Sequence, residues 1–288
     1  METPVLYFYG SRESTANVKV FFPQGVITEW YPKAAAAGSL NNVMEWRDVR
    51  ISPDGRSDFP IEPGQSHYYA ARQTDSASLQ VGPQKEKFLF YRGVGTFPLP
   101  ISAKTLDRGR ILVKNLGADA VSAMIHFENR GGKFRYQLAG SVGSEIAFDS
   151  EPMLGNLTDL QTDLENVLVE QGLYKKEAQA MIATWRDSWF EEGSRLIYIV
   201  PRSVVDSILP LEIQPNPAQI VRVFVGRMEI ITPAILEDVK QAIANHDQLS
   251  LEKYGRFLEP IAKRIGARSP LLAAVYSSYL SRASACSP

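Results

Sequence analysis

The strongest constraint on the fold lies in the first 150 residues, where short runs of β-branched and aromatic residues alternate with turn signals. "NVKVFF", "KFLFYRG" and "RILVKNL" are such runs, and "PQG", "NLGAD" and "NRGGK" are turns between runs of this kind. In the first run Val18, Val20 and Phe22 fall on one side, as in a strand with one buried face. Short strands at intervals of about 8 to 12 residues predict an antiparallel sandwich or barrel.

Residues 109–149 predict an antiparallel meander of three or four strands with one face in water. In one of these strands Phe127 alternates with His126 and Glu128, so the histidine and the glutamate are expected on the wet face. The run "HYYAARQ", residues 67–73, predicts another strand by its composition. No glycine-rich turn links a strand to a helix, which disfavours a nucleotide-binding α/β fold.

After about residue 152 the hydrophobic period becomes helical. Thr158 and Gln161 form a capping box, and Gly172 is a stop signal, so a helix is predicted between them. A second helix is predicted over residues 175–190, which makes a helical hairpin. Strand patterns then return in "RLIYIVP", "LPLEI" and "QIVRVFVGRMEII"; the last is apolar on both faces for part of its length, as in a strand buried on both sides.

Three further helices have clear start signals, at Thr232-Pro233, Ser250 and Ser269-Pro270. Pro260 lies inside the middle one, so that helix is expected to bend or break there. The predicted fold class is therefore mixed and mainly β. Residues 1–150 are expected to form a sandwich-like region. Residues 151–288 are expected to supply the helical hairpin, strands that complete the β core and a helical C-terminal cap, without forming an independent domain.

The composition narrows the range of partners. The chain has 288 residues and a net charge of −1, so no global electrostatic attraction to nucleic acid is expected, and no nucleic-acid partner is predicted. Its single cysteine, Cys286, excludes an intrachain disulfide and a cysteine metal site. No apolar run approaches the roughly 18 residues that cross a bilayer, so no membrane span is predicted.

The N-terminal segment "METPVLYFYG" lacks the features of a signal peptide. A strand-like run nevertheless begins three residues after Met1, which is compatible with a leader or another strand upstream. The compartment is therefore left open, and an extracytoplasmic location is expected only if such a leader exists.

The stretch "ATWRDSWFEEG", residues 183–193, combines two tryptophans with three carboxylates. Trp185 and Trp189 are four residues apart and share one helical stripe, a spacing typical of core packing. Gly193 is expected to end this helix, which would place the carboxylates near its negative end. An anion there is unfavourable by about 0.3–1 kcal/mol. The carboxylates concerned are Asp187, Glu191 and Glu192.

The negative charge at that helix end can be compensated in two ways. Arg186 or Arg195 can reach the helix end from within the chain. The alternative is an external cation, a metal, or a ligand with hydroxyls and a positive centre. The internal arginine is the preferred interpretation.

A second candidate group lies on the predicted strand near residue 126. His126 and Glu128 share one face, and Arg130 follows in the turn, so the three could form an acid–base or binding group. A solvated polar face is the preferred interpretation of the same pattern. The histidines lack the spacing of a sequence-local zinc site, and no metal or cofactor is predicted.

Two hypotheses for function follow. The first is a non-catalytic binding or structural and interaction protein with a protein or polymer partner, because no nucleophile, metal or nucleotide motif is recognisable. The alternative is a hydrolase of a glycan or related polymer, in which carboxylates of the stretch 183–193 act as acid and base and its tryptophans stack on the sugar. The predicted binding residues are Trp185, Arg186, Trp189, His126, Glu128 and Arg130, and the catalytic residues of the alternative are Asp187, Glu191 and Glu192.

Overall fold

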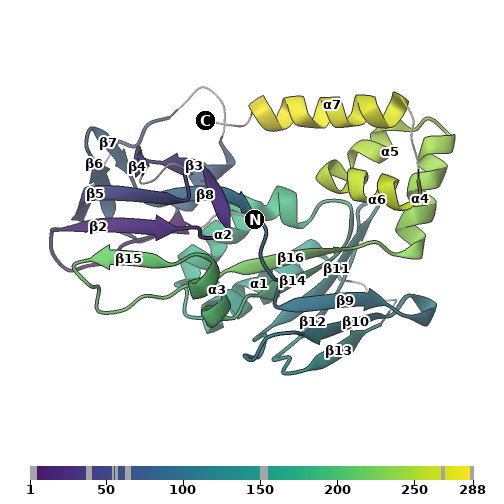
Figure 1. Ribbon diagram of the computed structural model, residues 1–288, viewed down its shortest axis with the longest axis horizontal. Coiled ribbons are helices and arrows are strands. Elements are labelled where there is room, and N and C mark those ends of the chain that lie inside the picture. Colours follow the sequence, from purple (N-terminus) through teal and green to yellow (C-terminus); the bar gives the residue numbers. More distant parts are fainter. Residues whose placement is uncertain are drawn as a thin grey trace. The chain divides into compact units, whose positions relative to one another are not determined.

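The computed structural model describes residues 5–36, 41–53, 55, 58–61, 66–149, 155–266 and 270–285 (Figure 1). It is mixed and mostly antiparallel, with four sheets among the described residues, which confirms the predicted fold class. Cys286 lies outside the described residues. No helix in the described ranges is both long and apolar enough to cross a membrane.

The chain divides into two compact units, each assembled from separate segments. Unit 1 comprises Met1–Pro100, Asp163–Trp185 and Ile199–Val225, and unit 2 comprises Ile101–Thr162, Arg186–Tyr198 and Gly226–Pro288. Segments from the second half of the chain therefore take part in both units, and each unit is described by itself.

Unit 1 contains two antiparallel sheets. The larger has the order β15-β2-β5-β6-β7, with β4 also paired to β5, and the smaller has the order β1-β8-β3. The strands are β1 (Val5–Leu6), β2 (Ser14–Phe21), β3 (Gly25–Tyr31), β4 (Ala35–Ala36), β5 (Val43–Ser52), β6 (Ser78–Val81), β7 (Gln84–Glu86), β8 (Leu89–Gly95) and β15 (Leu211–Gln214).

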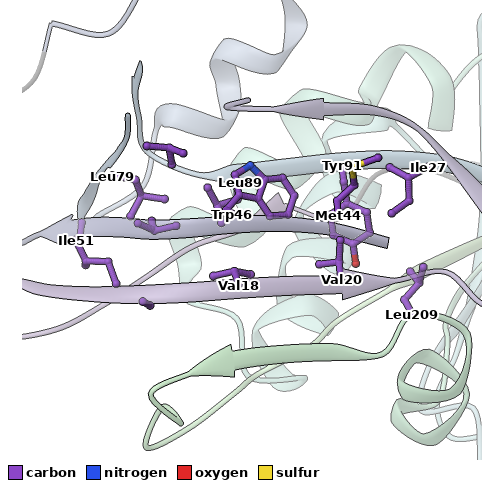
Figure 2. Packing of buried hydrophobic residues seen from close by; sticks show 14 of the residues in the cluster. Val18, Val20, Ile27, Met44, Trp46, Ile51, Leu79, Leu89, Tyr91 and Leu209 are labelled. Carbon is purple, nitrogen blue, oxygen red and sulfur yellow. The ribbon is translucent and has the colours of Figure 1, made fainter. Parts of the chain in front are cut away.

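The core of unit 1 joins side chains of these two sheets, as in a sandwich (Figure 2). Val18 and Val20 on β2 are fully buried, as their alternation predicts. Trp46 on β5 is also fully buried, and its indole Nε1 donates to the carbonyl of Pro32 at 2.7 Å. The smaller sheet contributes Leu89 to the same cluster. Burial of an aromatic ring with its polar atom satisfied makes Trp46 a central packing element.

The strand predicted over residues 67–73 is wrong, because this segment forms the 3-10 helix η1 (His67–Arg72). The Ser66 side chain accepts a hydrogen bond from Tyr68 N and caps the helix start. At the other end Arg72 forms hydrogen bonds with both oxygens of Glu86, at 2.7 to 3.2 Å. These capping and ion-pair contacts outweigh the strand propensity of the aromatic residues.

Unit 2 also contains two sheets, of orders β13-β10-β9 and β12-β11-β14-β16. The single meander predicted over residues 109–149 is wrong: β10 pairs with β9 and β13, whereas β11 pairs with β12 and β14. Every residue of β14 is buried, so its backbone groups need strand partners, which β11 and β16 supply. The strands are β9 (Ile101–Thr105), β10 (Ile111–Asn115), β11 (Met124–Arg130), β12 (Lys133–Ala139), β13 (Glu145–Phe148), β14 (Gly193–Ile199) and β16 (Val225–Ile230).

Strand β11 is buried on both faces, so the expected wet face is also wrong. His126 is 3% exposed, and its ring packs at 5.8 Å from that of Phe148 on β13. On the opposite face the Phe127 ring lies 5.6 Å from the Phe190 ring. A second sheet covers one face and the end of the helix that precedes Phe190 covers the other, so both faces of β11 are closed to water around His126 and Phe127.

The predicted helical hairpin is confirmed by α1 (Leu157–Glu170) and α2 (Lys175–Trp189). Gly172 between them has a φ of 101°, a conformation that favours glycine. The remaining helices are α3 (Arg202–Ile208), α4 (Pro233–Ala244), α5 (Gln248–Glu252), α6 (Leu258–Arg264) and α7 (Pro270–Ala285), with the 3-10 helices η2 (Asp107–Gly109) and η3 (Gly255–Phe257). The sequence patterns do not predict α3.

The break expected near Pro260 is present but precedes the proline: α5 ends at Glu252 and α6 begins at Leu258. Pro260 then stands in the first turn of α6, where its missing N–H leaves no intrahelical hydrogen bond unmade. The α4 start is as predicted, because Thr232 accepts a hydrogen bond from Ile235 N.

Candidate functional site

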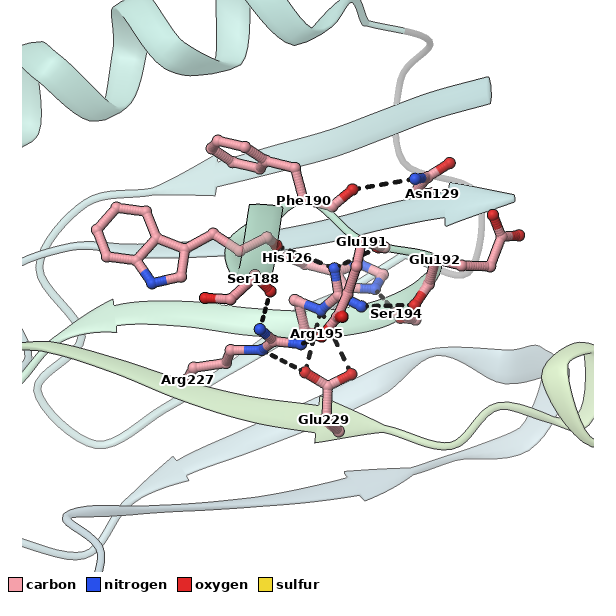
Figure 3. Close-up of polar contacts among 11 residues, drawn as sticks. His126, Asn129, Ser188, Phe190, Glu191, Glu192, Ser194, Arg195, Arg227 and Glu229 are labelled. Carbon is pink, nitrogen blue, oxygen red and sulfur yellow. Dashed lines mark hydrogen bonds and ion pairs between the residues drawn. The ribbon is translucent and has the colours of Figure 1, made fainter. Parts of the chain in front are cut away.

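The C-terminal end of α2, in unit 2, is enclosed by two arginines (Figure 3). Arg195 is fully buried on β14. Its Nη1 donates to the carbonyls of Trp189 at 2.9 Å and Glu191 at 2.6 Å, and its Nη2 donates to that of Glu192 at 2.7 Å. Arg227 on β16 donates to the carbonyl of Ser188. These cationic donors satisfy carbonyls that a helix end leaves without partners.

Two carboxylates balance the two arginines. Glu229 accepts from Arg195 Nε at 3.0 Å and from Arg227 Nε at 2.6 Å, and Glu191 accepts from Arg227 Nη2 at 2.6 Å. Burial lowers the pKa of Arg195, and the neighbouring Glu229 opposes that effect. We call these four residues the arginine–glutamate network. Its formal charges cancel, which is what buried ionic groups require.

The predicted internal compensation by Arg195 is therefore confirmed, whereas Arg227 was missed. A signal for Arg227 does exist in the sequence. Arg227 and Glu229 are two residues apart, hence on one face of a strand, inside an otherwise apolar run. A charged pair in such a run indicates a buried partner, but the sequence does not identify that partner as the end of α2.

The three candidate catalytic carboxylates have different surroundings. The Asp187 side chain is 82% exposed, with Oδ1 at 3.3 Å from Nε of Arg186, whose own side chain is 65% exposed. Glu191 belongs to the arginine–glutamate network. Glu192 Oε1 accepts from the backbone N–H of Gly131 at 2.7 Å.

The two candidate tryptophans are both packed against aromatic rings. Trp185, in unit 1, is half-buried and lies edge-on to Tyr68, with ring centroids 6.0 Å apart. Trp189, in unit 2, is 2% exposed and lies edge-on to Phe190, with centroids 6.4 Å apart. Core packing is the preferred interpretation of this pair. It applies to Trp189, which is buried, and only partly to Trp185, which is half-buried.

His126 is buried beside Ser194 of β14, with Nε2 at 3.0 Å from the serine Oγ. Its Nδ1 has no hydrogen-bond partner among the described residues. Burial lowers the pKa of His126 to about 4, so the ring is neutral near pH 7. A neutral buried imidazole with one satisfied nitrogen is a packed core residue, and the predicted solvated position of His126 is wrong.

Glu128 and Arg130 lie farther along β11, near α4. Arg130 makes a forked ion pair with Asp238, with Nη2 at 3.0 Å from Oδ1 and 2.8 Å from Oδ2. Burial raises the pKa of Glu128, while Arg130 and Arg135 act in the opposite direction. Both side chains remain partly accessible, unlike that of His126.

The end of β11 and the turn that follows it connect the two candidate groups. Asn129 Nδ2 donates to the carbonyl of Phe190 at 3.0 Å, and Gly131 N donates to Glu192. Glu192 is also close enough to Glu128 to oppose its ionisation. Glu192 therefore lies near Glu128 and Arg130, whereas Glu191 belongs to the arginine–glutamate network. Asp187 and Arg186 form a separate exposed pair, and Trp185 belongs to the other unit.

A small pocket, with room for about one water molecule, lies beside this site, entirely within unit 2. Glu192, Ser194, Glu229 and Tyr254 are among the residues around it, together with side chains from the end of β16, α4, η3 and α6, but the surface that these residues present to the pocket is apolar. Among the described residues, no three His, Cys, Asp or Glu side chains converge in a way that could hold a metal ion.

Comparison with protein-family models, with curated proteins and with solved structures finds no match to this chain. The chemistry of the site therefore follows from its own geometry. That geometry offers a neutral, internally paired ionic centre, a mainly apolar pocket beside it, and one carboxylate, Glu192, at the boundary between the two.

Proposed function

We propose that this protein is a non-catalytic binding or structural protein that acts through contacts with a protein partner. The observation that carries the proposal is the arginine–glutamate network. Both of its arginines donate hydrogen bonds to its glutamates and to backbone carbonyls at the end of α2. Groups engaged in this way stabilise a fixed architecture.

The contrast with acid–base catalysis supports the same proposal. A glycan hydrolase needs two carboxyl groups that face one bond from about 5 to 10 Å apart, one of them able to donate a proton. Glu191 is bound to Arg227, and Asp187 is exposed beside Arg186. The indole of Trp189, one of the two proposed stacking platforms, is buried.

An exposed aromatic pair in unit 1 is a further feature typical of interaction surfaces. Tyr9 and Tyr174 are 42% and 62% exposed, and their ring centroids lie 4.8 Å apart in an edge-on arrangement. Tyrosine is enriched at protein interfaces because it combines a large apolar ring with a polar tip.

A matched pair of variants tests the proposal. Glu191→Gln breaks the arginine–glutamate network, and Asp187→Asn makes the same chemical change at an exposed site. We expect Glu191→Gln alone to lower the thermal midpoint, and we expect the wild-type protein to release no reducing sugar from a panel of oligosaccharides. The proposal is overturned if wild type releases sugar and Asp187→Asn or Glu192→Gln abolishes the release without changing the midpoint.

A further inference from the structure

Strand β15 is the edge of the larger sheet of unit 1, beside β2 (Figure 1). Phe21 N on β2 donates to the carbonyl of Pro210, just before β15. Because the hydrogen-bonding direction alternates along an antiparallel strand, Glu212 also faces β2, whereas the backbone N–H and C=O groups of Leu211 and Ile213 point away from it. These four outward groups have no hydrogen-bond partner within the described ranges, so β15 has an open edge.

The core face of the sheet is incompletely covered at this edge. Leu211 and Ile213 pack against the core cluster of unit 1 but are only half-buried. Val20 and Val18, which lie opposite them on β2, are fully buried. Burial of this face therefore decreases from β2 to β15. One more strand with apolar residues on this face would complete the cover.

On the solvent face, charged residues alternate in sign across three neighbouring strands. Glu45 on β5 lies opposite Lys19 on β2, and Lys19 lies opposite Glu212 on β15. Opposite charges at directly paired positions stabilise a sheet, and like charges destabilise it. Glu212 is exposed and ends this row, so its outer side has no cross-strand neighbour in the sheet. The next position outward therefore favours a cation.

The same row argues against a second copy of this chain as the occupant of the edge. An antiparallel pair of β15 strands that used every outward group of both copies would place Glu212 opposite its equivalent in the second copy. Two carboxylates at directly paired positions repel each other. Charged side chains of this kind protect edge strands against self-pairing. The edge is therefore suited to a different chain.

We propose that the outer edge of β15 binds an extended segment of a partner protein as an additional antiparallel strand, with a lysine or arginine opposite Glu212 and an aliphatic residue on each side of it. The segment pairs with the backbone of Leu211 and Ile213, and its two aliphatic side chains extend the core face. β15 has four residues, between Pro210 and Pro215, so the paired segment is short. The inference rests on the proposed function as an interaction protein and names the kind of partner.

The test uses three peptides and the full-length protein, with binding followed by NMR titration. The first peptide is acetyl-Thr-Ile-Lys-Ile-Thr-amide, the second has glutamate in place of lysine, and the third is the lysine peptide with both isoleucine nitrogens methylated. We expect the lysine peptide to bind about threefold to tenfold more tightly than the glutamate peptide. The methylated peptide should not bind measurably, because it lacks the N–H donors for the edge. Equal affinity of the three peptides, or no binding by the lysine peptide, overturns the inference.

Amide hydrogen exchange locates the binding. In the free protein the amides of Leu211 and Ile213 should exchange faster than that of Glu212, which faces β2. Saturation with the lysine peptide should slow exchange of the first two amides several-fold. Peptide binding that leaves these two rates unchanged overturns the inference. If the rates in the free protein fall as its concentration rises, the occupant is a second copy and the proposed partner is overturned.

Variants of Glu212 test the charge preference. Glu212→Gln keeps the size of the side chain and removes its charge, so it should bring the affinities of the lysine and glutamate peptides to within about twofold. Glu212→Lys should reverse the preference. Glu237→Lys, the matched control at an exposed glutamate of unit 2, should keep the wild-type preference. A wild-type preference in both Glu212 variants overturns the inference.

The inference and the proposed function fail in different experiments. Sugar release by the wild-type protein, lost in Asp187→Asn or Glu192→Gln, overturns the proposed function. Peptide affinity is measured without turnover, so absence of the lysine preference overturns the inference alone.

Discussion

The guanidinium of Arg195 donates to the backbone carbonyl of Glu191, only four residues earlier, at 2.6 Å. A side chain at the start of a strand thereby closes the end of the helix that precedes it. Removing the guanidinium should therefore lower the free energy of unfolding. We expect Arg195→Met to lower the free energy of unfolding by about 3–5 kcal/mol, because it leaves buried carbonyls without donors and Glu229 with one arginine fewer. Urea unfolding measures the change.

Arg186 is the matched control for that experiment. Its side chain is 65% exposed, so Arg186→Met should change the free energy of unfolding by no more than about 0.5 kcal/mol. A comparable loss in both variants would show that Arg195 has no special role at the helix end.

His126 should make stability depend on pH in acid. Its folded-state pKa of about 4 lies below the ordinary value of 6.5, so between these two pH values the unfolded chain binds more protons than the folded one. The contribution of the neutral ring is fully present above pH 6.5 and is lost as pH falls toward 4, amounting to on the order of 2–3 kcal/mol. Unfolding curves of wild type and His126→Phe across this range should diverge by that amount.

The exposed His246 serves as the control for the pH experiment. It has a φ of 54°, a conformation that asparagine tolerates, so His246→Asn should keep the fold and the wild-type pH slope. A wild-type slope that persists in His126→Phe would assign the effect to other groups.

Gly226 allows the ring of Tyr198 to lie against the backbone of β16. A Cβ at this position would overlap that ring, and Tyr198 is 2% exposed with little room to move. We expect Gly226→Ala to destabilise unit 2 by about 1–3 kcal/mol, measured by thermal unfolding. Gly140→Ala, where a Cβ meets no atom within 4 Å, should be close to neutral, and equal effects would argue against the overlap.

The forked pair of Arg130 and Asp238 should contribute little, despite its short distances. The two side chains are 43% and 37% exposed, so solvent screens their attraction. A double-mutant cycle with Arg130→Ala and Asp238→Ala should give a coupling energy below about 1 kcal/mol. A much larger value would mean that this pair, like the arginine–glutamate network, is a buried structural centre.

Local patterns predict local structure well in this chain. The alternation at Val18 and Val20 predicts the buried face of β2, and the start signal at Thr232 predicts α4. The strand prediction for η1 was wrong because the contacts that decide it come from Ser66 and from Glu86, outside the segment itself.

Local patterns do not predict which strands pair or which residues contact the charged side chains. Nothing in the sequence around β11 indicates that β14 becomes its neighbour, and that pairing is part of the arrangement that buries His126. In the same way, the stretch 183–193 identifies Arg195 as a candidate partner because it is near in sequence. Arg227 is found only when the sheet brings β16 beside β14.

The division of both units among distant segments has a consequence for biosynthesis. The edge strand β15 of unit 1 and the edge strand β16 of unit 2 both lie beyond residue 210, so neither sheet is complete until that part of the chain has been synthesised. Until then β2 and β14 each present an unpaired edge, the kind of surface on which nascent chains aggregate. Slower elongation through the codons for residues 211–230, or a chaperone that binds the nascent chain at that stage, should therefore affect the yield of folded protein more than the same measures applied earlier.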